Sequence, residues 1–170
     1  GTPPAVGQPF AGGTFLANAS TSPVLHSGLT SGTKYYYKAF SYDGIGNYSF
    51  GLTANATTLC DPLTLPYSES FDAALFPPSC WSLENAGLGN NWTRTATSTY
   101  SGAGAMRYSW NSTNPANAWA FTPAFNLQSG KTYRITFFQR VDGDTTYPEK
   151  MKVTVGNAPT SAAQTTVLWD

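Results

Sequence analysis

The sequence has little of what catalysis usually requires. It holds one histidine, His26, and two cysteines, Cys60 and Cys80. A catalytic triad needs a base that is held by a third group beside a nucleophile, and nothing around His26 indicates either partner. A zinc site needs several Cys or His ligands at short spacing, and the chain has three such residues in total. We therefore predict that the chain is not an enzyme.

Charge is also scarce. Charged residues make up 11% of the chain, against about 25% in an average soluble domain. Nine basic and nine acidic residues cancel, so no net field favours nucleic acid or an anionic membrane surface. No apolar run reaches the ~18 residues that a membrane helix needs. We predict no nucleic-acid partner and no membrane insertion.

Helical periodicity is absent over any useful length, and the composition favours strands. Aromatic residues make up 15% of the chain, and Ser and Thr are abundant, whereas Leu, Glu and Lys are few. β-Branched and aromatic side chains fit a pleated surface. Pro and Gly recur about every 8 to 15 residues, a spacing typical of sandwiches. We predict an all-β fold of antiparallel β-sandwiches.

Alternating apolar and polar residues locate the strands. In the clearest case, residues 33–42, Tyr35 and Tyr37 fall on one face and Lys38 on the other. The turn at 43–47 predicts a hairpin loop. Further strands are predicted at 48–58, 118–121, 133–141 and 151–155.

The two cysteines suggest a disulfide. An even number of cysteines in a chain rich in Ser, Thr and Asn indicates an oxidising compartment. A bond between Cys60 and Cys80 would close a loop of about 20 residues and contribute roughly 3 kcal/mol. The alternative is a pair of buried free thiols.

The first part of the chain resembles the end of a fibronectin type III domain. Residues 28–38 carry a Leu, a Gly-Thr pair and a Tyr at the spacing of that family's strand corner. The resemblance implies a structural role for Tyr35, whose hydroxyl would bond to the upstream backbone. It covers residues 1–59, without the family's early strands, so we expect a partial type III domain.

The second part resembles the cleaved-adhesin family. This family comprises the jelly-roll, MAM-like modules of gingipain haemagglutinin regions and of type IX-secreted proteins of Bacteroidota. The segments that carry the resemblance are 65–71, 78–81, 118–123, 130–137 and 147–153. It covers residues 60–170 and lacks the family's later strands, so we expect the N-terminal part of a jelly roll.

The second resemblance also implies a structural calcium ion. The family takes calcium ligands from its first and final strands, and Glu69 and Asp72 match the first set. The separate loop cluster of Asp142, Asp144 and Glu149 is a weaker calcium candidate, because it lacks the EF-hand spacing. The alternative for both groups is that they are solvated carboxylates at strand ends.

Two tryptophans are candidate ligand contacts. Trp92 and Trp110 lie in stretches rich in Asn, Ser and Thr. An exposed indole can stack on a sugar while neighbouring amides bond to its hydroxyls. The alternative is that both rings fill the core, which is our expectation for Trp81 and Trp119.

These features predict a non-catalytic adhesion or ligand-binding segment of a larger, secreted or cell-surface bacterial protein. Its partner would be a protein or glycan on a host or neighbouring cell, and repeated weak contacts would add up through effective concentration. One alternative is a structural spacer in a secreted peptidase or polysaccharide hydrolase. Another is a cargo fragment bound to components of a secretion machine.

Overall fold

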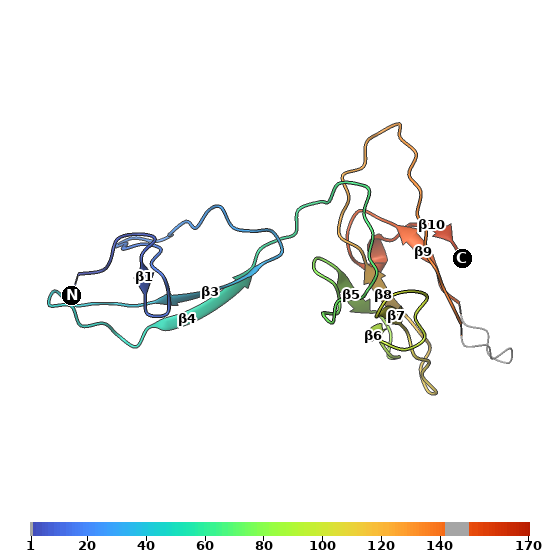
Figure 1. The fold of residues 1–170 in the computed structure, drawn as a ribbon, viewed down its shortest axis with the longest axis horizontal. Helices are drawn as coiled ribbons and strands as arrows, with labels where there is room; N and C mark the ends of the chain where they lie inside the picture. Colours follow the sequence, from blue (N-terminus) through green and yellow to red (C-terminus); the bar gives the residue numbers. More distant parts are fainter. Residues whose placement is uncertain (1, 142–149) are drawn as a thin grey trace. The chain divides into compact units, whose positions relative to one another are not determined.

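The computed structural model describes residues 2–141 and 150–170. Within them, every regular element is a β-strand except one short 3-10 helix, and each pair of strands is antiparallel. The predicted all-β, antiparallel fold class is therefore confirmed. The chain divides into two compact units, Gly1–Asp61 and Pro62–Asp170 (Figure 1). The boundary lies two residues after the one predicted.

The first unit is built around one hairpin. Strand β3 (Lys34–Ala39) pairs with β4 (Leu52–Thr57) over their full lengths. A smaller pair, β1 (Pro9–Phe10) and β2 (Gly13–Thr14), comes before it in the chain. The β3–β4 hairpin corresponds to the strands expected from alternation, although both end earlier toward the turn at 43–47.

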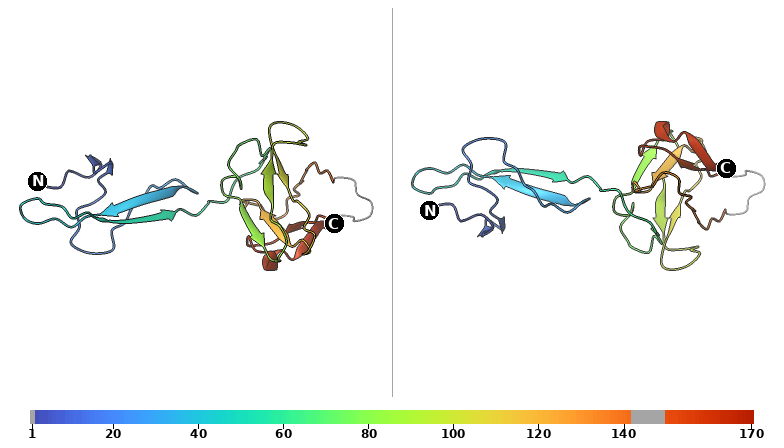
Figure 2. Two further views of the ribbon diagram at one scale, coloured as in Figure 1. Left: turned by 90° about the horizontal axis from the view of Figure 1, so that it is seen from below. Right: turned by 90° about the horizontal axis from the view of Figure 1, so that it is seen from above.

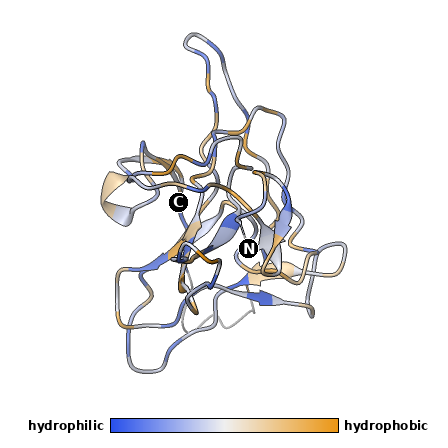
Figure 3. Ribbon diagram, turned by 90° about the vertical axis from the view of Figure 1, so that its left-hand side faces the viewer, coloured by the Kyte–Doolittle hydropathy of each residue, from blue (hydrophilic) through white to orange (hydrophobic). Residues whose placement is uncertain are grey.

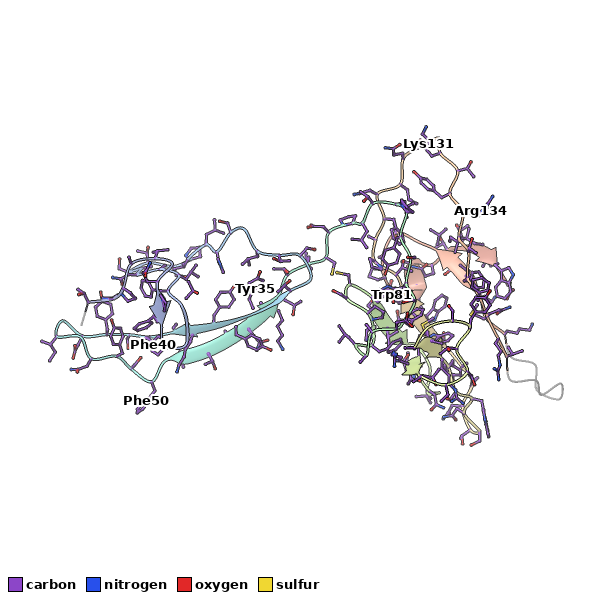
Figure 4. The ribbon with its side chains drawn as sticks, in the orientation of Figure 1. Tyr35, Phe40, Phe50, Trp81, Lys131 and Arg134 are labelled. Carbon is purple, nitrogen blue, oxygen red and sulfur yellow. The ribbon has the colours of Figure 1, made fainter. Side chains whose placement is uncertain are left out.

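Aromatic contacts hold the first unit together. The ring of Phe10 lies within 5.1–5.8 Å, centroid to centroid, of Phe15, Phe40 and Tyr48. By contrast, Phe50 is 99% exposed and points away from the hairpin (Figure 4). The cluster therefore covers one end of the hairpin and leaves much apolar surface open to solvent.

The described residues of the second unit form three two-stranded sheets, which Figure 2 shows from two sides. Their strands are β5 (Ser82–Asn85) with β8 (Ala118–Phe121), β6 (Thr93–Thr95) with β7 (Ala105–Arg107), and β9 (Val153–Val155) with β10 (Thr166–Trp169).

A carboxylate ties the short helix to the first of these sheets. The 3-10 helix η1 (Ser161–Ala163) lies between β9 and β10 in the chain. Both oxygens of Glu84 on β5 accept hydrogen bonds from Ser161, one from its backbone N–H at 2.7 Å and one from its hydroxyl at 2.6 Å. The contact links residues 77 positions apart, so it holds η1 against β5.

The core of the second unit is small. Among the described residues, Phe121 is the one large apolar side chain that is buried, at 7% exposure. The half-buried ring of Trp119 lies nearly parallel to it, with the centroids 6.2 Å apart. Elsewhere in the unit, the half-buried rings of Phe71 and Trp81 meet edge-on, with their centroids 5.4 Å apart. Hydrophobic residues also appear along loops in Figure 3. Packing here depends on ring contacts near the surface rather than on a deep interior.

One strand prediction is wrong. Residues 133–141 alternate clearly in sequence, yet they form no strand in the structure. A strand is defined by a paired neighbour, and no described segment forms a strand ladder with these residues. The strands expected at 118–121 and 151–155 are present, the latter reduced to β9.

No described helix has the length and apolar character that crossing a bilayer requires.

Candidate functional site

The side chain of Trp110 is exposed on a fixed backbone. It follows β7 and is 71% exposed. The amide of Asn90 donates to the carbonyl of Ser109 at 3.0 Å and to that of Trp110 at 2.9 Å. The indole therefore faces solvent while its main chain is held, which limits the entropy lost when a ligand stacks on it.

A small pocket of about 150 Å³ opens beside this ring. Its lining residues are Tyr108, Trp110, Asn111, Asn114, Pro115 and Ala116. We refer to these six residues as the Trp110 patch. A flat aromatic face next to a shallow polar hollow is a geometry that suits a ring-shaped polar ligand.

The hydroxyl of Tyr108 is the most unusual group in the Trp110 patch. It is buried and has no hydrogen-bond partner among the described residues. Gly89 allows its close position, because a Cβ there would lie 3.0 Å from this oxygen. A buried hydroxyl without a partner costs roughly 1–3 kcal/mol. A ligand group that bonds to Tyr108 would recover that cost.

The asparagines of the patch divide into two roles. The side-chain oxygen of Asn111 accepts from the backbone N–H groups of Thr113 and Asn114, at 2.9 and 2.8 Å. Its amide nitrogen donates to Asn90 at 3.3 Å. These bonds shape the turn. The side chain of Asn114 bonds to no described residue, so its amide is available to a ligand hydroxyl.

Trp92, the other predicted contact, is half-buried. Its indole N–H donates to the carbonyl of Ala118 at 2.9 Å. Its ring meets that of Tyr108 edge-on, with the centroids 5.7 Å apart. Trp92 therefore packs against Tyr108 of the Trp110 patch, and a ligand contact by Trp92 stays a prediction.

The predicted calcium residues Glu69 and Asp72 already have hydrogen-bond donors. Asp72 accepts from the backbone N–H groups of Ala103 and Gly104. Glu69 accepts from the N–H of Phe71 at 2.7 Å, and its other oxygen lies 3.4 Å from the Tyr67 hydroxyl. The two carboxylates thus accept hydrogen bonds from different segments of backbone.

A cation is also already in place. The guanidinium of Arg94 donates to the carbonyls of Phe71, Asp72 and Ala103, at 2.7, 2.9 and 2.8 Å. Calcium prefers six to eight oxygen ligands. Here these three carbonyl oxygens already accept hydrogen bonds from Arg94. Gly104 has no room for a side chain, because a Cβ would collide with the Phe71 carbonyl and Arg94.

As arranged here, these oxygens do not fit a calcium ion, although calcium binding stays a prediction. No cluster of three or more Asp, Glu, His or Cys side chains suited to a metal occurs among residues 2–141 and 150–170. The second calcium candidate, at Asp142, Asp144 and Glu149, lies outside the described residues.

The remaining predicted residues have structural contacts. In the first unit, the backbone N–H of Thr30 donates to the Tyr35 hydroxyl at 2.9 Å, which links the corner to the strand. His26 lies 3.0 Å from the Tyr37 hydroxyl and edge-on to both tyrosine rings. Within the described residues, this is its one hydrogen bond.

Cys60 and Cys80 are joined in a disulfide, as predicted. The bond closes the loop at residues 61–79, which includes Glu69 and Asp72. Free buried thiols, the alternative, are excluded in this structure.

The expected dependence of stability on pH follows from three carboxyl groups. Hydrogen bonds lower the pKa of each: chiefly from the backbone N–H of Asn47 for Asp43, from that of Ala103 for Asp72, and from the Ser161 hydroxyl for Glu84. Since the folded pKa is depressed, these bonds stabilise the fold above the ordinary pKa values of 3.8 and 4.5. That stability is lost as the pH falls through the folded values.

We therefore expect the free energy of unfolding in urea to decrease between pH 5 and pH 3. Glu84→Gln should make this decrease smaller, because the amide does not titrate. An equal decrease in wild type and variant would show that Glu84 does not contribute.

No family model, curated protein or solved structure matches this chain. The resemblances to fibronectin type III and cleaved-adhesin domains therefore stay predictions. Sequence reasoning missed Tyr108, Asn114 and Arg94. The Asn-rich stretch around Trp110 was the one local signal for the first two.

Proposed function

We propose that this chain is a non-catalytic, carbohydrate-binding adhesion segment of a larger secreted or cell-surface bacterial protein. The single observation that carries the proposal is the Trp110 patch, where an exposed indole on a fixed backbone adjoins the buried, unpartnered hydroxyl of Tyr108. Sugars present flat C–H faces and rings of hydroxyls, and this patch offers an aromatic plane with nearby polar groups.

The disulfide supports a secreted or cell-surface location. Disulfides persist in oxidising compartments such as the periplasm and the cell exterior. The single histidine supports a binding role over catalysis, since His26 bonds to Tyr37 and to no described carboxylate.

The larger pocket of the second unit is a less suitable glycan site. It measures about 570 Å³ and is lined by Thr64, Leu65, Phe125, Asn126, Leu127, Gln128 and Tyr133. The backbone N–H of Gln128 donates to the Tyr133 hydroxyl at 2.7 Å, so this phenol is already engaged. We therefore place carbohydrate binding at the Trp110 patch.

A glycan array followed by calorimetry tests the proposal. We expect binding to one class of glycans and a loss of at least about tenfold in affinity for Trp110→Ala, because an aromatic anchor dominates a small interface. Phe50→Ala is the matched control, because it removes a 99% exposed ring from the other unit. It should leave the affinity unchanged.

Two results would count against the proposal. If no glycan binds at millimolar concentration, the spacer hypothesis is preferred. If binding persists in Trp110→Ala, the glycan site lies elsewhere on the chain.

A further inference from the structure

Residues 132–139 have the sequence of a strand without its pairing. Among the described residues, their backbone N–H and C=O groups make no hydrogen bond. In Figure 1 the segment runs as a trace, without an arrow, after the loop at 128–131. A run of unpaired backbone groups is a template for pairing with another strand.

The side chains of this segment already alternate between two faces. Phe137 meets Trp169 of β10 with the ring centroids 5.5 Å apart. The next residue, Phe138, stacks on Tyr100 at 3.7 Å. These contacts fix which residues would face which side, so an added strand would meet a defined register.

Much apolar surface on this segment is open. Ile135 is 60% exposed, Phe137 40% and Phe138 66%. The whole chain exposes 13095 Å², whereas 170 folded residues expose about 8,000 Å² as one compact domain and under about 10,000 Å² as two. The excess of exposed surface is larger than the ~1,600 Å² that a standard protein interface buries.

The segment is also basic. Arg134 lies within it, Lys131 and Arg140 directly flank it, and no acidic residue occurs between Asp72 and Asp142 except Glu84. Lys131 and Arg134 form no ion pair with a described residue. Figure 4 shows both side chains pointing outward. A strand that pairs here would be favoured by acidic residues opposite these cations.

We propose that residues 132–139 bind an extended acidic peptide strand of another polypeptide by β-augmentation. Backbone hydrogen bonds would supply affinity, and the side chains would set specificity. One face of the incoming strand would be apolar, against Ile135 and Phe137, and the other acidic, against Arg134. The proposal goes beyond carbohydrate binding and involves a different surface.

Charge argues against a second copy of this chain as the occupant. Antiparallel pairing of two copies about Phe137 would place Arg134 opposite Arg140. Like charges directly opposite are destabilising in a sheet. An acidic strand removes this repulsion, so we commit to it.

Hydrogen exchange on the full chain tests the proposal. The probes are a ten-residue peptide of alternating valine and glutamate, and a control peptide of alternating valine and lysine. We expect the acidic peptide to slow amide exchange in residues 132–139 by at least about tenfold, because formed strand bonds protect amides. High salt should weaken the effect by screening.

Variants distinguish the contribution of backbone pairing to peptide binding from the contribution of charge. Thr136→Pro removes a backbone donor from an exposed position and should abolish protection, whereas Thr136→Ala should keep it. Arg134→Glu should weaken binding of the acidic peptide, and Arg107→Glu, an exposed cation on β7, should not.

Three outcomes would overturn the proposal: no protection by the acidic peptide, equal protection by the lysine peptide, or concentration-dependent protection without any peptide. The last would identify a second copy of the chain as the occupant.

Discussion

Phe121→Ala is expected to destabilise the second unit by about 3 kcal/mol, near the lower end of the range for Phe→Ala changes in cores. Phe121 is 7% exposed, and no other large apolar side chain among the described residues is as buried. The low end applies because the neighbouring ring of Trp119 is half-buried and can move into part of the space. The loss is still a large fraction of a typical domain's stability.

Tryptophan fluorescence during urea unfolding measures this effect in the second unit alone. All five tryptophans, at positions 81, 92, 110, 119 and 169, follow the boundary at Asp61. Leu88→Ala is the matched control, since Leu88 is 83% exposed in the same unit and should change stability by less than about 0.5 kcal/mol. A loss below about 1 kcal/mol for Phe121→Ala would mean that the unit's stability does not depend on this core.

Breaking the disulfide is expected to cost about 3 kcal/mol, because a loop of about 20 residues gains conformational freedom in the unfolded chain. The loop includes Phe71, which contacts Trp81 next to Cys80. Reduction, or the double change Cys60→Ser and Cys80→Ser, should therefore lower the urea midpoint read from tryptophan fluorescence.

Two controls accompany this experiment. Reducing agent should have no effect on the double variant. The native, unreduced protein should gain no mass with iodoacetamide, because neither cysteine is free. Alkylation of the native protein, or an unchanged midpoint after reduction, would contradict the role assigned to the bond.

Alternation predicted β3, β4, β8 and β9 and missed the other six strands of the described residues. It cannot report which segments pair. The hairpin of β3 and β4 was predicted because both strands and their turn lie within one short stretch of sequence. Residues 133–141 alternate equally well and form no strand, because pairing depends on a second segment. Periodicity indicates which side chains would share a face of a strand. It does not indicate whether a neighbouring strand is present.

The sequence around the two candidate tryptophans could not separate their roles. Trp92 and Trp110 have similar Asn-rich neighbours, yet one donates to Ala118 and the other is exposed. The difference arises from contacts over 26 residues. Local composition therefore predicted the region of the Trp110 patch, and the fold decided which ring faces solvent.

The calcium prediction shows a similar limit. Glu69 and Asp72 were identified by resemblance, which cannot show that Arg94 approaches the same loop from 22 residues away. A guanidinium that bonds to three carbonyls can stand where a metal ion would otherwise be expected. Only the three-dimensional contacts revealed that these oxygens are engaged.

The central claim, that this chain binds carbohydrate through the Trp110 patch, is tested most directly by NMR of the tryptophan indole N–H signals during titration with an array-selected glycan. We predict that the Trp110 signal shifts most. Those of Trp81 and Trp92, whose indoles bond to Tyr67 and Ala118, should shift little. Movement of another indole signal while that of Trp110 stays unchanged would contradict the claim.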